Sequence, residues 1–377
     1  MTEIRIRKVT SNKDLRRFVD FPFQLYKGNA YWVPPLKFDE ISTLRKDKNP
    51  AYEYCDADYW LAYRDSTVVG RIAGIINNHE CTRWKKSLVR FGWIDFVDDP
   101  AVSRGLIETV AEWGAARGMT GIHGPLGFTD MDAEGMLLEG FDQISALSAI
   151  YNYPYYNDHM RQLGFLKAAD WVQFEIRVPA GIPEKITRMN RIVLQRYDLR
   201  ILQPRSRKEI RPYASKMFNM YNDAFDNIYG FTALTQKQID AYTRQYFSFI
   251  RPEFVSLVLD AKDDVVGFGI TMPSLARALK KAGGKLFPFG FIHLLKALHK
   301  NDTIHMYLVG VRPDYQGKGI LALVYHELTK AYIDAGITIA RTHPQLEENR
   351  RALSVWKNYE GRVNIRRRCW IRPIATA

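Results

Sequence analysis

The stretch from Met306 to Leu321, MYLVGVRPDYQGKGIL, most constrains the fold, because an apolar strand runs into a glycine-containing loop and then into a helix. Such a loop leaves backbone N–H groups free at the positive end of a helix dipole, and that combination binds phosphate. This turn carries neither the Walker pattern nor the dinucleotide pattern Gly-x-Gly-x-x-Gly. The sequence therefore predicts an α/β fold with a site for a different phosphate-bearing ligand.

A regular order of elements follows this loop. Apolar residues recur at intervals of three and four from Leu321 to Ala335, and they predict a helix that ends at Gly336. Residues 337–341 alternate like a strand, and residues 347–361 are typical of a second helix stopped by glycine. A last strand is expected over residues 362–371.

This order, together with the spacing Gln316-x-x-Gly319 after Val-x-Pro, resembles the C-terminal half of the GNAT superfamily of acetyltransferases. The family pattern is Gln/Arg-x-x-Gly-x-Gly/Ala, and the chain departs from it at the last position, which holds Leu321. The resemblance implies an α/β (α+β) fold with a mixed, twisted sheet flanked by helices. It also implies acetyl-CoA or a longer acyl-CoA as co-substrate.

The resemblance further implies which residues hold the acyl-CoA. The strand backbone at Val309 and Val311 would pair with the pantetheine arm. The pyrophosphate would bind to the loop amides, which belong to Gln316, Gly317, Lys318, Gly319 and Ile320. Asn349 begins the last helix with the family's Asn-x-x-Ala spacing and is expected at the cofactor as well.

Acyl transfer to an amine needs a group that removes a proton and groups that stabilise an oxyanion. His305 lies where some relatives place a general-base glutamate, and an unperturbed histidine pKa of about 6.5 suits a base. Strand alternation puts Tyr307 on the same face as an alternative acid or base. The oxyanion is expected to meet a backbone N–H near Val309 to Val311. The alternative for His305 is a structural role at a strand entry.

The expected proton donor is missing from the pattern. Many relatives have a tyrosine seven residues after the asparagine that protonates the departing thiolate, but this position holds Trp356. Tyr359 could replace it if the helix rotates or the acceptor sits differently. The alternative is that both residues belong to the core and surface of an amphipathic helix. Acceptor contacts are expected from residues near the end of the preceding strand, namely His343, Glu347 and Glu348.

The first half of the chain repeats parts of this pattern without the loop. A hairpin is predicted over residues 59–77, a helix over 101–117, and a closing helix over 155–165. Where a phosphate loop belongs, the chain has Val97-Asp-Asp-Pro, and two aspartates would repel pyrophosphate. We therefore predict two tandem GNAT-like domains, 1–182 without a CoA loop and 183–377 with one.

The second half begins with a polar link near Pro183 and a strand over residues 197–202, and a hairpin over 254–270 repeats the Val-Val-Gly of the first half. Residues 273–300 are an insertion with two short amphipathic, basic helical pieces. This insertion could be a lid or interdomain packing element, a membrane-surface contact, or the lining of a tunnel for a long acyl chain.

Composition limits the remaining classes. A chain of 377 residues suits two domains. Its net charge of +13 calls for an anionic partner, which acyl-CoA supplies in part, and its basic clusters are too scattered to indicate a specific nucleic acid. The three cysteines show no disulfide or metal-ligand spacing, so no metal site is expected. The N-terminus lacks the apolar core of a signal peptide, which favours a cytoplasmic protein.

The sequence thus favours an acyltransferase that moves an acyl group from acyl-CoA to a small or lipid-like amine acceptor. Two alternatives stay open. One is a transferase that uses aminoacyl-tRNA, as some related tandem folds do. The other is a non-catalytic acyl-CoA-binding or membrane-surface protein, which Trp356 favours. The acceptor, the acyl length and the oligomeric state do not follow from the residues.

Overall fold

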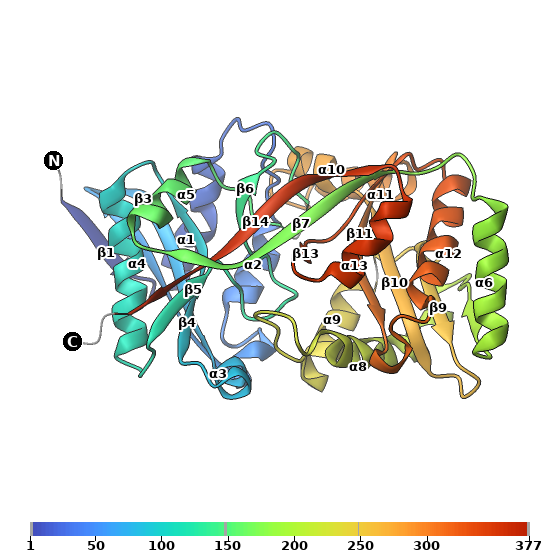
Figure 1. Ribbon diagram of the computed structural model, residues 1–377. Helices are drawn as coiled ribbons and strands as arrows, with labels where there is room; N and C mark the ends of the chain where they lie inside the picture. The colour runs from blue at the N-terminus through green and yellow to red at the C-terminus, as the bar shows by residue number, and fades with distance from the viewer. Residues whose placement is uncertain (1–2, 147–148, 248, 375–377) are drawn as a thin grey trace. The chain divides into compact units, whose positions relative to one another are not determined.

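The computed structural model describes residues 3–146, 149–247 and 249–374 (Figure 1). Contacts divide the chain into two compact units. Unit 1 comprises Met1–Trp171, Ala276–His293 and Ile365–Ala377, and unit 2 comprises Val172–Leu275 and Leu294–Asn364. Three elements contribute residues to both units, namely β7 (Leu166–Arg177), α11 (Gly290–His299) and β14 (Gly361–Pro373). The predicted sequence domains 1–182 and 183–377 follow the repeated order of elements rather than these contacts, and they stay a prediction.

Unit 1 is a mixed sheet with helices on both faces. Its strands are β1 (Ile4–Lys8), β2 (Cys55–Arg64), β3 (Thr67–Asn77), β4 (Leu88–Phe96), β5 (Gly121–Gly124) and β6 (Met136–Glu139). Its helices are α1 (Asn12–Leu25), α2 (Lys37–Leu44), η1 (Pro50–Glu53), α3 (Asn78–Trp84), α4 (Pro100–Ala115), α5 (Tyr155–Gln162) and α10 (Ala276–Ala282). The strand order is β1-β2-β3-β4-β5-β14, and within this order β4 and β5 pair in parallel while the other neighbours are antiparallel.

Two cores lie on the two faces of this sheet, because successive residues of a strand point to opposite sides. Ile72 and Ile76 of β3 belong to a core that includes Leu106 of α4. Ile75 belongs to a second core, which includes Phe18 of α1. The alternation within β3 therefore places α4 and α1 on opposite faces.

Unit 2 repeats this plan. Its strands are β8 (Arg200–Leu202), β9 (Val255–Leu259), β10 (Val265–Pro273), β11 (Thr303–Val311), β12 (Ile339–Arg341) and β13 (Gln345–Leu346). Its helices are α6 (Glu184–Arg196), α7 (Arg207–Ile210), η2 (Arg211–Tyr213), α8 (Ala214–Phe225), α9 (Gln236–Tyr246), η3 (Pro252–Phe254), η4 (Pro313–Tyr315), α12 (Ile320–Asp334), α13 (Arg350–Ser354) and η5 (Val355–Asn358). The strand order is β7-β12-β11-β10-β9-β8.

The repeated Val-Val-Gly has a packing role in each unit. A Cβ on Gly267 of β10 would lie 2.5 Å from Ile320 of α12, and a Cβ on Gly70 of β3 would lie 2.8 Å from Leu106 of α4. Both distances are too short for real atoms, so the glycines let the helix approach the sheet closely. In unit 1, α4 follows β4, which pairs with β3. In unit 2, α12 follows β11, which pairs with β10.

Most predicted elements are confirmed. Both hairpins form, as β2–β3 and β9–β10, and the insertion contains the two helical pieces α10 and α11. The strand expected over 197–202 is wrong at its start, because α6 runs to Arg196 and β8 begins only at Arg200. The segment around Pro183 was expected to be a link, but it begins α6, whose Val193 packs against the core of unit 2. Figure 1 shows α6 in green beside α12 in orange-red.

The helix predicted over 347–361 is also wrong in extent. α13 ends at Ser354, a 3-10 turn continues to Asn358, and Tyr359 is extended with φ −120° and ψ 148°. The interruption comes where Trp356 enters the core, with 5% of its surface exposed. Packing of this large ring therefore overrides the sequence pattern of a continuous helix.

Candidate functional site

The glycine loop forms the connection between β11 and α12. Gly317 and Gly319 both adopt left-handed conformations, with φ of 78° and 85°, which a side chain disfavours. Gly319 is the N-cap of α12 and supplies no side-chain hydrogen bond to the helix. Residues 316–319 are exposed. The N–H groups of Gln316 and Lys318 donate to the carbonyls of Pro313 and Tyr315, both at 3.2 Å. Those of Ile320 and Leu321, in the first turn of α12, are the donors that this end of the helix can offer to an anion.

The strand that leads into the loop has an open edge. β11 pairs with β12 only over Thr303 to His305. On its other side, the register with β10 shifts so that Tyr307 is an extra residue between two paired ones. A bulge of this kind bends the strand and increases its twist. β11 therefore runs on beyond His305 without β12.

Val309 and Val311 turn their backbone groups toward this open edge. The N–H of Arg312 donates to the carbonyl of Val266 in β10 at 3.0 Å. Backbone groups of successive residues in an antiparallel strand alternate between its two edges. Residues at odd steps from Arg312, namely Val309 and Val311, therefore direct their N–H and C=O groups away from β10. An extended ligand could pair with them as a strand would.

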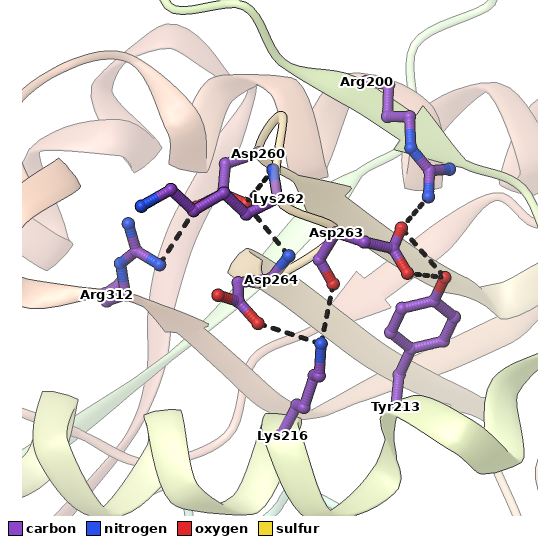
Figure 2. Close-up of polar contacts among 8 residues, drawn as sticks. All are labelled: Arg200, Tyr213, Lys216, Asp260, Lys262, Asp263, Asp264 and Arg312. Carbon is purple, nitrogen blue, oxygen red and sulfur yellow. Dashed lines mark hydrogen bonds and ion pairs between the residues drawn. The ribbon is translucent and has the colours of Figure 1, made fainter.

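Ion pairs fix the start of the loop (Figure 2). The Arg312 guanidinium donates to Asp314 at 2.8 and 3.1 Å and to Asp260 at 3.2 Å. Asp260 in turn accepts from the N–H groups of Lys262 and Asp264, at 3.0 and 2.9 Å, which closes the β9–β10 turn. Arg312 thereby ties the loop entry to a rigid hairpin.

The corresponding connection in unit 1, between β4 and α4, is built differently. Asp99 is the N-cap of α4, its carboxylate accepts from the N–H of Ala101 at 2.8 Å, and Pro100 follows it without an N–H. The edge of β4 beyond its pairing with β5 is also occupied, because Leu126 donates its N–H to the carbonyl of Phe91 at 2.9 Å. Negative charge and the chain itself thus take the places that a CoA pyrophosphate and pantetheine would need.

Two polar rings, those of the buried His305 and the half-buried Tyr307, lie on β11 near the point where β12 separates. The ring centroids of His305 and Tyr307 are 6.1 Å apart. Neither nitrogen of His305 nor the hydroxyl of Tyr307 has a hydrogen-bond partner among the described residues. Burial, together with the charges of Arg341 and His343, lowers the pKa of His305 from 6.5 to about 3. Burial raises the pKa of Tyr307, so the imidazole is neutral and the phenol is protonated at neutral pH.

Comparison with known proteins identifies the second part of the chain. Residues 215–359 match the Acetyltransferase (GNAT) family. This region belongs to the GNAT family. The matched residues include β11, the glycine loop and α12. Membership makes the protein an acyltransferase that uses an acyl-CoA.

Relatives and solved structures extend this likeness to most of the chain. Protein YghO of Escherichia coli (strain K12) is 27% identical over 317 residues, which cover 82% of this chain and 79% of that protein. Bacterial ceramide synthase of Caulobacter vibrioides (strain NA1000 / CB15N) is 25% identical over 323 residues, covering 83% and 82%. A tandem GNAT protein from the clavulanic acid biosynthesis pathway superposes with a TM-score of 0.57 at 13% identity and covers all of both chains. The tandem GNAT fold is thus confirmed.

The GNAT domain uses Trp356 as a core residue. The Trp356 ring lies 4.8 Å from that of Tyr325 and 6.1 Å from that of Phe174, and its indole N–H donates to Gln345 at 2.9 Å. Tyr359 follows the helix and interacts with Thr329 of α12. Within the described part of the chain, no hydrogen bond or ring contact joins Tyr359 to His305 or Tyr307. The structure brings His305 and Tyr307 together but leaves Tyr359 outside that pair.

The remaining predicted residues have structural partners. Asn349 is the N-cap of α13, and its side chain accepts from the N–H of Ala352 at 3.2 Å. The ammonium group of Lys318 lies 4.8 Å from the ring centre of Tyr315 and 5.4 Å from that of Tyr197. His343 lies close enough to His305 to help lower the pKa of His305. The roles of Asn349 and Lys318 at the cofactor, and of Glu347 and Glu348 at the acceptor, stay predictions.

The sequence reasoning passed over a group of acidic residues in unit 1. Burial raises the pKa of Asp132 to about 6, and burial with nearby Asp130 raises the pKa of Glu134. The Asp132 carboxylate accepts from the N–H groups of Phe128 and Thr129, at 2.8 and 3.1 Å. Three acids in the five residues 130–134 were the available signal. These two hydrogen bonds hold the Asp132 carboxylate within the loop.

Two further findings concern other classes of site. Among residues 3–146, 149–247 and 249–374, no group of His, Cys, Asp and Glu side chains is arranged to hold a metal ion. In the same ranges, no helix combines the length and the apolar character needed to cross a bilayer. The cytoplasmic location stays a prediction.

Proposed function

We propose that the GNAT domain transfers a long acyl chain from acyl-CoA to the amine of a long-chain, lipid-like acceptor. The acceptor class is suggested by the relative named bacterial ceramide synthase, because a ceramide is the fatty amide of a long-chain amino alcohol. The observation that carries the acyl-CoA part is the combination of the open β11 edge with the uncapped N-terminus of α12.

The cofactor would bind along β11. Its pyrophosphate would meet the amides of residues 316–320, which are exposed or begin the helix. Its pantetheine arm would pair with the backbone of Val309 and Val311 at the open edge. The thioester would then lie toward the bulge at Tyr307, where β11 and β12 part. This direction brings the reacting carbon to the rings of His305 and Tyr307.

The reaction forms a C–N bond and breaks a C–S bond. The neutral amine attacks the thioester carbonyl, and a backbone N–H near Val309 stabilises the oxyanion. As the C–S bond breaks, CoA leaves as a thiolate, and the proton that the attacking nitrogen loses ends on that sulfur. His305 accepts a hydrogen bond from the amine and orients it, since a histidine with a pKa of about 3 is too weak a base to hold the proton. Tyr307 relays this proton, giving its own to sulfur while taking up the one that the nitrogen loses, or donates a hydrogen bond to the carbonyl.

The test measures release of free CoA thiol by the full-length chain, with palmitoyl-CoA or acetyl-CoA as donor and sphinganine as acceptor. We expect turnover with palmitoyl-CoA that depends on sphinganine. Lys318→Glu should raise the Kd for acyl-CoA about tenfold, ~1.4 kcal/mol, because it puts a negative charge beside the pyrophosphate. Lys330→Glu, exposed near the far end of the same helix, is the matched control and should bind as the wild type does.

The outcomes separate this proposal from its alternatives. Binding of palmitoyl-CoA without thiol release in the presence of sphinganine or of smaller amines would favour a non-catalytic acyl-CoA-binding protein. Turnover with acetyl-CoA and a small amine, but not with sphinganine, would keep the acyl transfer and overturn the lipid acceptor. Binding of charged tRNA that weakens steeply with salt would favour the aminoacyl transferase.

A further inference from the structure

The insertion at residues 273–300 carries positive charge alone. Its twenty-eight residues contain no aspartate or glutamate. Its cations are Arg277, Lys280, Lys281, Lys285, Lys296 and Lys300. Such a segment attracts a negatively charged surface and repels a positive one.

One of these cations anchors the segment within unit 1. The ammonium group of Lys280 donates to the carbonyls of Asn29, Ala30 and Trp32, at 2.9, 2.6 and 3.2 Å. Leu279 beside it is fully buried. Three carbonyl acceptors satisfy the three donors of an ammonium group, so Lys280 serves the fold. The next turn is held as well, because the carbonyl of Gly284 accepts from the N–H of Lys37 at 3.1 Å.

Beyond Gly284 the segment exposes large apolar side chains to solvent. The exposed fractions are 76% for Phe287, 67% for Phe289, 38% for Phe291 and 49% for Ile292, and we call these four residues the apolar tip. The rings of Phe287 and Phe291 lie 5.7 Å apart. Three aromatic rings and an isoleucine within six residues form a patch of the kind that marks an interaction surface.

Free cations stand on the same segment as the apolar tip. Arg277, Lys281 and Lys285 are exposed. Between them, Leu279 is buried and Lys280 donates to backbone carbonyls of unit 1, so these two side chains point toward the protein. The anchored face of α10 therefore differs from its exposed face, which carries Arg277 and Lys281, and exposed Lys285 leads along the chain to the apolar tip.

This combination fits a lipid surface better than a protein. The core of a protein interface is depleted in lysine, whereas an interfacial membrane anchor places aromatic rings at the headgroup boundary with Lys and Arg around them. Each basic residue near an anionic surface adds to binding. The absence of any acid across the insertion removes the repulsion that such a surface would otherwise meet.

We propose that the apolar tip, with Arg277, Lys281 and Lys285, docks the protein on an anionic lipid bilayer. The aromatic rings enter the boundary between headgroups and acyl chains, and the three cations meet the lipid phosphates. Docking does not depend on acyl transfer, so a protein that binds vesicles without turning over substrate would leave this proposal intact and remove only the proposed function.

The experiment is flotation of the full-length chain with vesicles of phosphatidylglycerol and phosphatidylethanolamine, and with vesicles of phosphatidylcholine alone. We expect flotation with the anionic vesicles only, weakening as salt increases. The double variant Phe287→Ser/Phe289→Ser should lose at least about tenfold in vesicle affinity, because two rings no longer leave water. Lys281→Glu/Lys285→Glu should lose about as much through charge.

Matched variants elsewhere in unit 1 control for exposed apolar area and for charge. Leu166→Ser removes a side chain that is 70% exposed on β7, and Lys85→Glu/Lys86→Glu reverses two exposed lysines after α3. Both should float as the wild type does, and circular dichroism should show that all variants fold. Failure to float with anionic vesicles, equal flotation with phosphatidylcholine, or wild-type flotation of the folded tip variant would each overturn the proposal.

Discussion

Asp99 and Gly319 hold the same place in the two units, since each is the N-cap of the helix that follows the strand next to the hairpin. Asp99 caps α4 with its own carboxylate, whereas Gly319 leaves the first turn of α12 without a side-chain cap. A helix N-terminus favours one negative group. In unit 1 the chain supplies that group itself, whereas in unit 2 no side chain caps the helix, as the proposed acyl-CoA site requires.

The first prediction concerns Gly319. In Gly319→Ala the methyl group would lie 3.2 Å from Val193, and the left-handed backbone at φ 85° would be strained. We expect the loop to shift and the Kd for acyl-CoA to rise about tenfold, ~1.4 kcal/mol. Isothermal titration with acyl-CoA measures this change.

Gly336→Ala provides the matched control for Gly319→Ala. Gly336 follows the other end of α12 at φ 69°, with nothing within 4 Å of an added Cβ. It should lower the free energy of unfolding through the same backbone strain, by about 1 kcal/mol, without changing the Kd. Equal effects of the two variants on the Kd would mean that the loop at Gly319 has no special part in binding.

The second prediction concerns the support of the loop at Arg312. Arg312→Gln removes the pairs with Asp314 and Asp260 and should weaken acyl-CoA binding severalfold by loosening the loop entry. The melting temperature should change little, because partly exposed pairs contribute about 1 kcal/mol or less. Arg200→Gln is the control, since Arg200 pairs with Asp263 in the same group of residues (Figure 2) and makes no ion pair with Asp314 or Asp260 in the described part of the chain. An unchanged Kd in Arg312→Gln would contradict this role.

Local sequence patterns predicted those elements of the fold whose conformation depends on neighbouring residues alone. The hairpins follow from alternation and turn residues. Asp99, one of the two acids predicted to repel pyrophosphate, is the N-cap of α4, and the absence of CoA binding in the first half stays a prediction. The failures come from packing. α6 is helical because Val193 and Leu194 pack on the core of unit 2, and α13 is cut short where Trp356 is buried. Neither contact has a signature in the local sequence.

The candidate site could be located from the sequence, but its chemistry could not. The spacing of Gln316 and Gly319 pointed to the loop, and strand alternation placed His305 beside Tyr307. The pKa of His305 was expected near that of a free histidine, and burial overturns that expectation. The open edge of β11 depends on a one-residue register shift against β10, which no pattern in a single strand encodes.

The third prediction concerns Trp356, which stands where many relatives have a catalytic tyrosine. Trp356→Phe removes the hydrogen bond to Gln345 and leaves space beside Tyr325, so unfolding should become easier by about 1–3 kcal/mol. CoA release at 25 °C should stay within about twofold of the wild type, because the indole lies in the core. Denaturant unfolding and the thiol assay measure the two effects. A loss of turnover far beyond the loss of folded protein would give Trp356 a direct role.

The fourth prediction follows from the lowered pKa of His305. The folded protein holds this imidazole neutral down to a pH of about 3, whereas the unfolded chain binds a proton below about 6.5. The unfolded state therefore gains protons first as the pH falls, and His305 costs stability progressively between pH 6.5 and 3, by up to about 1.4 kcal/mol per pH unit. Above pH 6.5 the imidazole is neutral in both states, so His305 no longer costs stability.

His305→Gln isolates this contribution, because glutamine does not titrate. As the pH falls from 6.5 toward 4, the wild type should lose more unfolding free energy than the variant does. From pH 7 to 9 the difference between their unfolding free energies should stay constant. Urea unfolding at each pH supplies the values. Because the imidazole is already neutral, kcat/KM of the wild type should show no break near pH 6.5 from this residue. A parallel pair of stability curves, together with a rate break at pH 6.5 that His305→Gln removes, would show that His305 titrates normally and acts as the base.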